Sequence, residues 1–152
     1  MTVQTGLAQN NADRIVISVD VMGGDEGPAT VVAGCDMSAQ RNPNLHFIFH
    51  GPENDIAPIV QLRSALQGRS EVRDAPDIVT MDDKPSQVVR NGKNTSMWSA
   101  IEAVRNKEAS VAVSCGNTGA LMALSMIRLR KLPGVNRPAI AVLYPSSNPQ
   151  GS

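Results

Sequence analysis

Aromatic residues, cysteines and long hydrophobic runs are all scarce in this chain of 152 residues. Aromatic side chains make up only 3% of the residues, so the core must be built from Val, Ile, Leu, Ala and Met. The two cysteines, Cys35 and Cys115, lack metal-ligand spacing, which argues against a disulfide framework or a zinc site. No apolar stretch approaches the roughly 20 residues of a membrane helix, and the N-terminus lacks the features of a secretory signal. We therefore expect a reducing, cytoplasmic location.

An excess of charge is absent as well, since the 14 basic and 14 acidic residues balance. A chain without net charge has no global field to attract nucleic acid or anionic lipid. We expect no nucleic-acid partner, and any anion-binding site must be local. The length suits one domain with its own core.

Short β-branched runs alternate with segments of helical periodicity, which indicates an α/β fold with a mostly parallel sheet. We expect strands at residues 15–21, 45–50, 70–73, 110–113 and 139–144. We expect helices at 29–40, 54–67, 85–90, from Thr95 or Ser96 to Lys107, and at 118–132. Residues 1–13 are expected to form a disordered leader. Sheets of this kind rarely finish directly after a strand, so we expect the chain to be part of a longer, truncated domain.

Ligands of open α/β sheets bind beyond the carboxyl ends of the strands, and the strongest candidate there is SCGNTGA at residues 114–120. Its glycines, Gly116 and Gly119, let the backbone approach a ligand, while Asn117 and Thr118 offer side-chain donors. The helix that follows presents free N–H groups and the positive end of its dipole to an anion. The motif is not a P-loop, because no Lys follows its second glycine. A capped helix with glycines for tight packing fits the spacing equally well.

Two other segments are weaker candidates for an anion site. MGGDEGP, at residues 22–28, lacks dinucleotide-binding spacing, and Asp25 and Glu26 would repel a pyrophosphate. The polar stretch at 81–97 places Lys84 and Lys93 where they could face an anion, although a solvated surface is the default for such a stretch.

Three side chains in or near these loops belong to chemically reactive types, one cysteine and two histidines. A thiol at a helix N-terminus can act as a nucleophile. However, Cys115 has no histidine near it in the sequence, and small buried cysteines are commoner in proteins than reactive ones. His46 and His50 alternate with apolar residues on a predicted strand, which favours packed or surface roles. His50 retains a small claim to function because it lies at the carboxyl end of that strand.

Four stretches in order resemble the acyl-ACP:phosphate acyltransferase (PlsX) family of bacterial phospholipid synthesis: VDVMGGDEGP, MDDKPSQVVRNGKNTSM, VSCGNTGALMAL and LPGVNRPAIAV. The resemblance runs from about residue 15 to residue 143. It implies a Rossmann-like three-layer α/β/α fold, related to phosphotransacetylases and isopropylmalate-type dehydrogenases. Members of the family are about twice as long, so residues 14–152 would form the N-terminal portion of a phosphate acyltransferase domain.

The resemblance also implies a homodimer that makes acyl phosphate and free acyl carrier protein from acyl-ACP and orthophosphate. Phosphate is itself the nucleophile and a thiolate leaves well, so the enzyme needs to hold the anion and stabilise an oxyanion. No metal or cofactor is expected. Much of the carrier-protein surface and a peripheral membrane-association element are expected in the missing second half.

Transferred by position, the resemblance implies Asn117 and Lys93 as catalytic residues. It implies a phosphate-binding set of Gly23, Gly24, Asp25, Lys84, Ser96, Gly116, Thr118 and Gly119. The family usually has a small residue such as Ala where Cys115 stands, so the thiol is expected to be chemically inert. Two alternatives remain: a CoA-dependent phosphate acyltransferase of the same fold, or an inactive fragment that serves as an interaction module.

Overall fold

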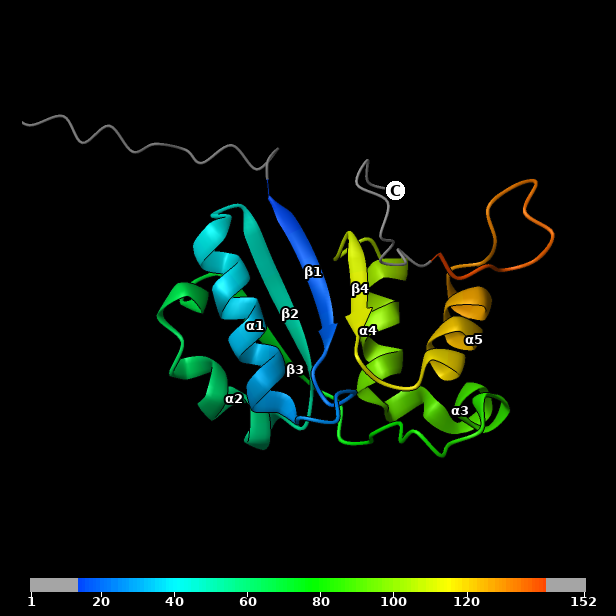
Figure 1. Ribbon diagram of the computed structural model, residues 1–152, viewed down its shortest axis with the longest axis horizontal. Coiled ribbons are helices and arrows are strands. Elements are labelled where there is room, and N and C mark those ends of the chain that lie inside the picture. Colours follow the sequence, from blue (N-terminus) through cyan, green and yellow to red (C-terminus); the bar gives the residue numbers. More distant parts are fainter. Residues whose placement is uncertain (1–13, 142–152) are drawn as a thin grey trace, which may run out of the picture.

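A computed structural model describes residues 14–141, which form a four-stranded parallel sheet with helices on both faces (Figure 1). The strands are β1 (Ile15–Asp20), β2 (Leu45–Gly51), β3 (Ser70–Asp74) and β4 (Val111–Ser114), arranged in the order β3-β2-β1-β4. The chain builds outward from β1 to β3 and then returns to place β4 on the other side of β1. This reversal creates a topological switch point between β1 and β4. The predicted Rossmann-like α/β fold is thereby confirmed.

The helices form the two outer layers, as Figure 1 shows. On one face lie α1 (Pro28–Arg41), α2 (Glu53–Gln61) and the 3₁₀ turn η2 (Ser64–Leu66). On the other face lie α4 (Ser96–Arg105) and, beside it, α3 (Pro85–Asn91), the 3₁₀ turn η3 (Gly92–Asn94) and α5 (Thr118–Arg128). Within residues 14–141, no helix combines the length and hydropathy needed to cross a bilayer.

The two faces of the sheet differ in chemistry because side chains alternate along each strand. Toward α1 and α2, the buried residues Val19, Phe47 and Phe49 form an apolar core with Val32 and Ile56. The alternate positions of β1 and β2 point toward α4 and include three buried polar side chains: Ser18, Asp20 and His50. A buried polar face must find hydrogen-bond partners in the helix that covers it.

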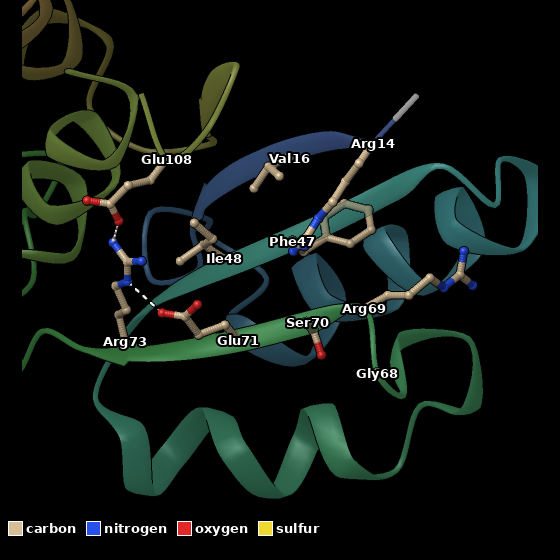
Figure 2. A pocket seen from close by; sticks show the side chains of 10 residues that line it. All are labelled: Arg14, Val16, Phe47, Ile48, Gly68, Arg69, Ser70, Glu71, Arg73 and Glu108. Carbon is tan, nitrogen blue, oxygen red and sulfur yellow. Dashed lines mark hydrogen bonds and ion pairs between the residues drawn. The ribbon is translucent and has the colours of Figure 1, made fainter. Parts of the chain in front are cut away.

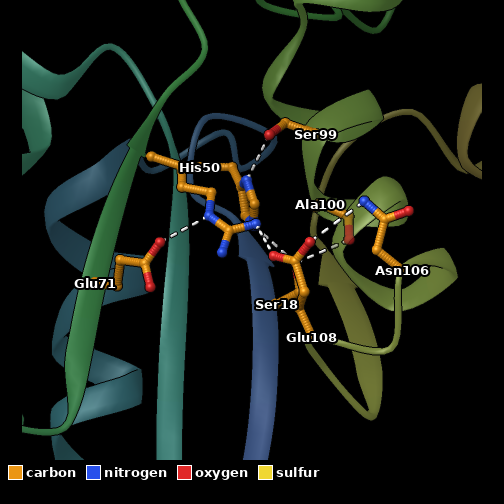
Figure 3. A network of polar contacts seen from close by, with 8 residues as sticks. Ser18, His50, Glu71, Ser99, Ala100, Asn106 and Glu108 are labelled. Carbon is orange, nitrogen blue, oxygen red and sulfur yellow. Dashed lines mark hydrogen bonds and ion pairs between the residues drawn. The ribbon is translucent and has the colours of Figure 1, made fainter.

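Hydrogen bonds of Ser18 and His50 join this polar face of the sheet to α4 (Figure 3). The Ser18 hydroxyl donates to the carbonyl of Ala100 at 2.8 Å, so it accepts from His50 Nε2, also at 2.8 Å. The Ser99 hydroxyl then donates to His50 Nδ1 at 2.7 Å. The imidazole is therefore neutral, with its proton on Nε2, and it joins β1 and β2 to α4.

Most predicted elements are confirmed to within two residues, but three differ. The helix expected at 54–67 ends at Gln61, because Arg63 is extended and the backbone N–H of Ala65 donates to Asp36 Oδ1 on α1. This break lets Leu66 enter the core. The helix expected at 118–132 ends at Arg128, since Arg130 has a left-handed backbone with φ of 67°.

The third difference concerns the end of the chain. Residues 139–141 form no strand, and the rest of the strand expected at 139–144 lies outside the described residues, as does the leader expected at 1–13.

We predict that His50 makes the stability of the protein depend on pH. Burial, and secondarily the positive charge of Arg73, lower its pKa from 6.5 to about 4, while Glu108 opposes this shift. The unfolded chain binds this proton more readily, so the stabilisation is complete above pH 6.5 and is lost as the pH falls toward 4. The loss amounts to about 3 kcal/mol at most, measurable by urea unfolding at a series of pH values.

Replacing His50 by Gln should flatten this dependence, although it costs stability at pH 7. The matched control is His46→Gln on the same strand, where the side chain is only partly buried. An unchanged pH dependence in His50→Gln would contradict the assignment.

Candidate functional site

Two glycine-containing turns touch at the switch point, one after β1 and one after β4. Asp20 and Ser114 are paired at the carboxyl ends of these strands, so the chain leaves both strands side by side. A Cβ at Gly23 would lie 2.8 Å from the backbone nitrogen of Gly116, and one at Gly116 would lie 2.9 Å from the carbonyl oxygen of Gly23. Only glycine fits at either position. The structure thus brings together the two loops that the sequence singled out separately.

A buried hydrogen-bond relay lies beneath this contact. The Ser114 hydroxyl donates to Asp20 Oδ2 at 2.7 Å and accepts from the backbone N–H of Gly116 at 3.1 Å. Asp20 is only 2% exposed, and its second oxygen, Oδ1, has no partner among the described residues. Sequence reasoning missed Asp20; the available signal was a carboxylate that ends the central strand IVISVD, whose other residues are apolar except Ser18.

Asn117 joins this turn to a distant segment of the chain. Its Oδ1 accepts from the backbone N–H of Ala120 at 3.0 Å, which caps α5. Its Nδ2 donates to the carbonyls of Thr80, Met81 and Asp83 at 3.0–3.2 Å. Because both ends of the amide are engaged, Asn117 holds residues 80–83 against the turn. Its catalytic role stays a prediction.

This attachment places Lys84 near the first turn of α5. Lys84 follows Asp83, is exposed, and occupies the position directly before α3. A Cβ at Gly119 would lie 3.1 Å from Pro85 Cγ, so the starts of α3 and α5 are in close contact. Thr118, the first residue of α5, is exposed beside them. The N-termini of α3 and α5, with Lys84 and Thr118 at their starts, therefore lie close together.

The N-terminus of α4 approaches the same edge of the sheet. Thr95 caps the helix by accepting from the backbone N–H of Trp98 at 3.2 Å. Ser96 is 1% exposed, and its hydroxyl oxygen has no partner among the described residues. It lies one helical turn before Ala100, which contacts Ser18.

Asp20 lies two residues beyond Ser18, on the same face of β1. One helical turn and two strand residues span similar distances. The unpartnered oxygens of Asp20 and Ser96 therefore lie on facing surfaces.

The remaining predicted residues are more peripheral. Asp25 and Lys93 are exposed, and among the described residues neither forms a hydrogen bond or an ion pair with 114–120. A Cβ at Gly24 would lie 3.6 Å from the Cβ of Cys115, which adds to the contact between the loops. Cys115 itself is exposed, and its expected inertness stays a prediction. It is Cys35, on α1, that is partly buried, and burial raises the pKa of its thiol to about 12.

A separate polar cavity of about 500 Å³ lies on the open part of the sheet, beside β2 and β3 (Figure 2). Its charged groups are partly neutralised, since Arg73 pairs with Glu71 at 2.8 Å and also with Glu108. It includes Val16 and Ser70, which lie toward the amino ends of their strands, and none of the predicted site residues. This cavity is therefore distinct from the switch point.

The chemistry available at the switch point is that of an anion-binding site. The N-terminus of α5 offers unpaired N–H groups and a positive dipole end, and Lys84 adds a full charge. The tight glycine contact fixes these groups in place without flexible side chains. Within residues 14–141, no three His, Cys, Asp or Glu side chains come together as metal ligands.

Comparison with known proteins gives consistent matches. The profile of a family described as "Fatty acid synthesis protein" matches residues 15–152. The chain is 76% identical to a phosphate acyltransferase of Roseobacter denitrificans over 151 residues, which covers 99% of this chain and 42% of that protein. It is 66% identical to a phosphate acyltransferase of Ruegeria sp. (strain TM1040), covering 99% of this chain and 40% of that protein. The chain thus spans about two-fifths of the length of these relatives.

We predict that Gly116→Ala destabilises the protein because the new methyl group would collide with the backbone of Gly23. Forcing the two turns apart should cost about 1–3 kcal/mol, measured as a decrease in the free energy of unfolding in urea.

The matched control is Gly34→Ala, within α1, where a Cβ meets nothing within 4 Å. That change should leave stability unaltered or raise it by about 0.5–1 kcal/mol, because alanine favours the helix. Equal effects of the two substitutions would show that the contact between the turns carries no constraint.

Proposed function

Because the chain belongs to the fatty acid synthesis protein family, we propose that it forms the phosphate-binding part of an acyl-ACP:phosphate acyltransferase. The enzyme would convert acyl-ACP and orthophosphate into acyl phosphate and free acyl carrier protein, as a step toward phospholipids. The observation that carries this proposal is the contact of the two glycine turns at the switch point, beside the N-terminus of α5 and Lys84. The names of the relatives support phosphate acyl transfer in general.

The reaction is a direct displacement that the site suits. A phosphate oxygen attacks the thioester carbon, a C–O bond forms, the C–S bond breaks, and the released thiolate takes up a proton. No enzyme nucleophile is needed, so the exposed Cys115 has no required role. The protein must hold phosphate beside the carbonyl and stabilise the developing negative charge, for which fixed backbone N–H groups are effective.

Each predicted residue takes a place in this scheme. The backbone of Gly116–Gly119, with the Thr118 hydroxyl, binds the phosphate oxygens, and Gly23 and Gly24 form the opposite wall. Asn117 keeps the turn and residues 80–83 in position. Lys84 neutralises the bound anion, and Lys93 supplies a second cation to the reacting groups. The exposed Asp25 lies at the rim of the site, and the buried Ser96 contributes its unpartnered hydroxyl to the floor.

We place the complete enzyme in the cytoplasm as a homodimer that binds acyl carrier protein and associates peripherally with the membrane. A CoA-dependent phosphate acyltransferase of the same fold is the second candidate. Acyl phosphate formation from acyl-ACP and from acyl-CoA, compared at equal phosphate concentration, distinguishes the two. If the chain binds no phosphate and forms no acyl phosphate, the interaction-module alternative is favoured.

We predict that Lys84→Met weakens phosphate binding about tenfold, because it removes the positive charge at the start of α5 and preserves the length of the side chain. Isothermal titration of the chain with inorganic phosphate at low ionic strength measures this change.

Lys107→Met is the matched control, because Lys107 follows α4 at the opposite edge of the sheet. It should bind phosphate like the parent chain. Equal losses in the two variants would indicate nonspecific attraction and would remove Lys84 from the site.

A further inference from the structure

An apolar groove of about 470 Å³ runs along the outer side of α5 and the segment that follows it. Its apolar walls are formed by Leu121, Met122, Met126, Leu129, Leu132 and Ile140. Several of these side chains are well exposed, with Met122 at 37%, Met126 at 38% and Leu129 at 40%. This size and lining are typical of small-molecule sites, which are concave and mostly apolar.

The groove occupies the face of α5 that the core does not use. The opposite face buries Ala120 and Leu124 against Met97 and Ile101 of α4. The outer residues recur at positions 118, 121, 122, 125, 126 and 129, which is the spacing of one continuous stripe on a helix. The stripe therefore extends along the full length of α5, about 16 Å at 1.5 Å per residue.

One end of the groove is the proposed phosphate site itself. Thr118 lines the groove and is also the first residue of α5, next to the turn at Gly116. In an acyl phosphate, the carbonyl carbon is bonded directly to a phosphate oxygen. The hydrocarbon chain must therefore leave the phosphate site without an intervening polar spacer, and an apolar path that begins at Thr118 meets this requirement.

We propose that the outer groove of α5 binds the acyl chain of the substrate, with the carboxyl end at Thr118 and the methyl end toward Leu132. This inference rests on the proposed function, because it is the phosphate site that fixes the direction of the chain. The methionines suit such a ligand, since their flexible, polarisable side chains adapt to chains of different length and curvature.

The far wall of the groove is held by the segment after α5. The Lys131 ammonium donates to the carbonyl of Asn136 at 2.9 Å, which closes a turn in the segment from which Val135 and Ile140 line the groove. Arg130 and Lys131 lie at the rim near the far end. Their aliphatic stems can cover the distal methylenes while the charges stay in water.

The test is titration of the chain with straight-chain carboxylates from hexanoate to dodecanoate, followed by NMR chemical shifts and by calorimetry. We expect affinity to rise by up to about fourfold for each added methylene, with the largest shifts at Met122 and Met126. Met126→Glu, which places a charge in the groove, should weaken dodecanoate binding at least tenfold, whereas Met126→Leu should retain it.

The matched control is Leu62→Glu, because Leu62 is 84% exposed at the end of α2, on the other face of the sheet. It should bind dodecanoate like the parent chain. Inorganic phosphate should bind Met126→Glu and the parent chain equally, which separates loss of the groove from loss of folding or of the phosphate site.

Three results would overturn the proposal. The first is an affinity that does not depend on chain length, and the second is equal dodecanoate binding by Met126→Glu and the parent chain. The third is a dimer in sedimentation that Met126→Glu dissociates and that excludes dodecanoate, which would assign the groove to a second copy. Carboxylate binding at the stripe without phosphate binding at the turn would instead contradict the proposed function and leave an acyl-binding site.

Discussion

The backbone contact between Gly23 and Gly116 is the constraint on which the site depends. It exists because parallel pairing sets Asp20 beside Ser114, so that two segments of the chain leave adjacent strands at one point. Their turns can pack this closely only without side chains. The relay from the Gly116 N–H through Ser114 to Asp20 then fixes the direction of the second turn. An anion site made of backbone groups requires this rigidity, because its donors have no side-chain freedom with which to adjust.

The helix layer above the site depends on a second, polar interaction. The face of the sheet toward α4 buries Ser18, Asp20 and His50, whereas the face toward α1 is apolar. Apolar packing alone would not fix the position of α4 along the strand direction. The hydrogen bonds of His50 and Ser18 define that position. Since α3 and α5 pack beside α4, these hydrogen bonds also set where the start of α5 lies.

The fold was largely predictable from the sequence, and the geometry of the site was not. Periodicity located the four described strands, and the glycine spacing identified both turns. Local pattern cannot reveal strand order, so the contact of Gly23 with Gly116 and the role of Asp20 stayed hidden. The early end of α2 has the same cause. Leu66 turns into the core after the backbone N–H of Ala65 donates to Asp36 on another helix, and no helical periodicity encodes such a partner.

The two ends of α5 show how one helix can serve a ligand that is both anionic and apolar. Asn117 fixes its N-terminus to residues 80–83. Arg128 fixes its C-terminus through Glu102, at 2.5 and 2.9 Å, and lies 4.8 Å from the ring centre of Trp98. Because α5 is held at both ends, the positive end of its dipole and its apolar stripe keep fixed positions relative to the rest of the domain. The distance from the glycine turn to the groove is then set by the helix itself. The proposed ligand can therefore place its phosphate at the turn and its hydrocarbon chain in the groove at the same time.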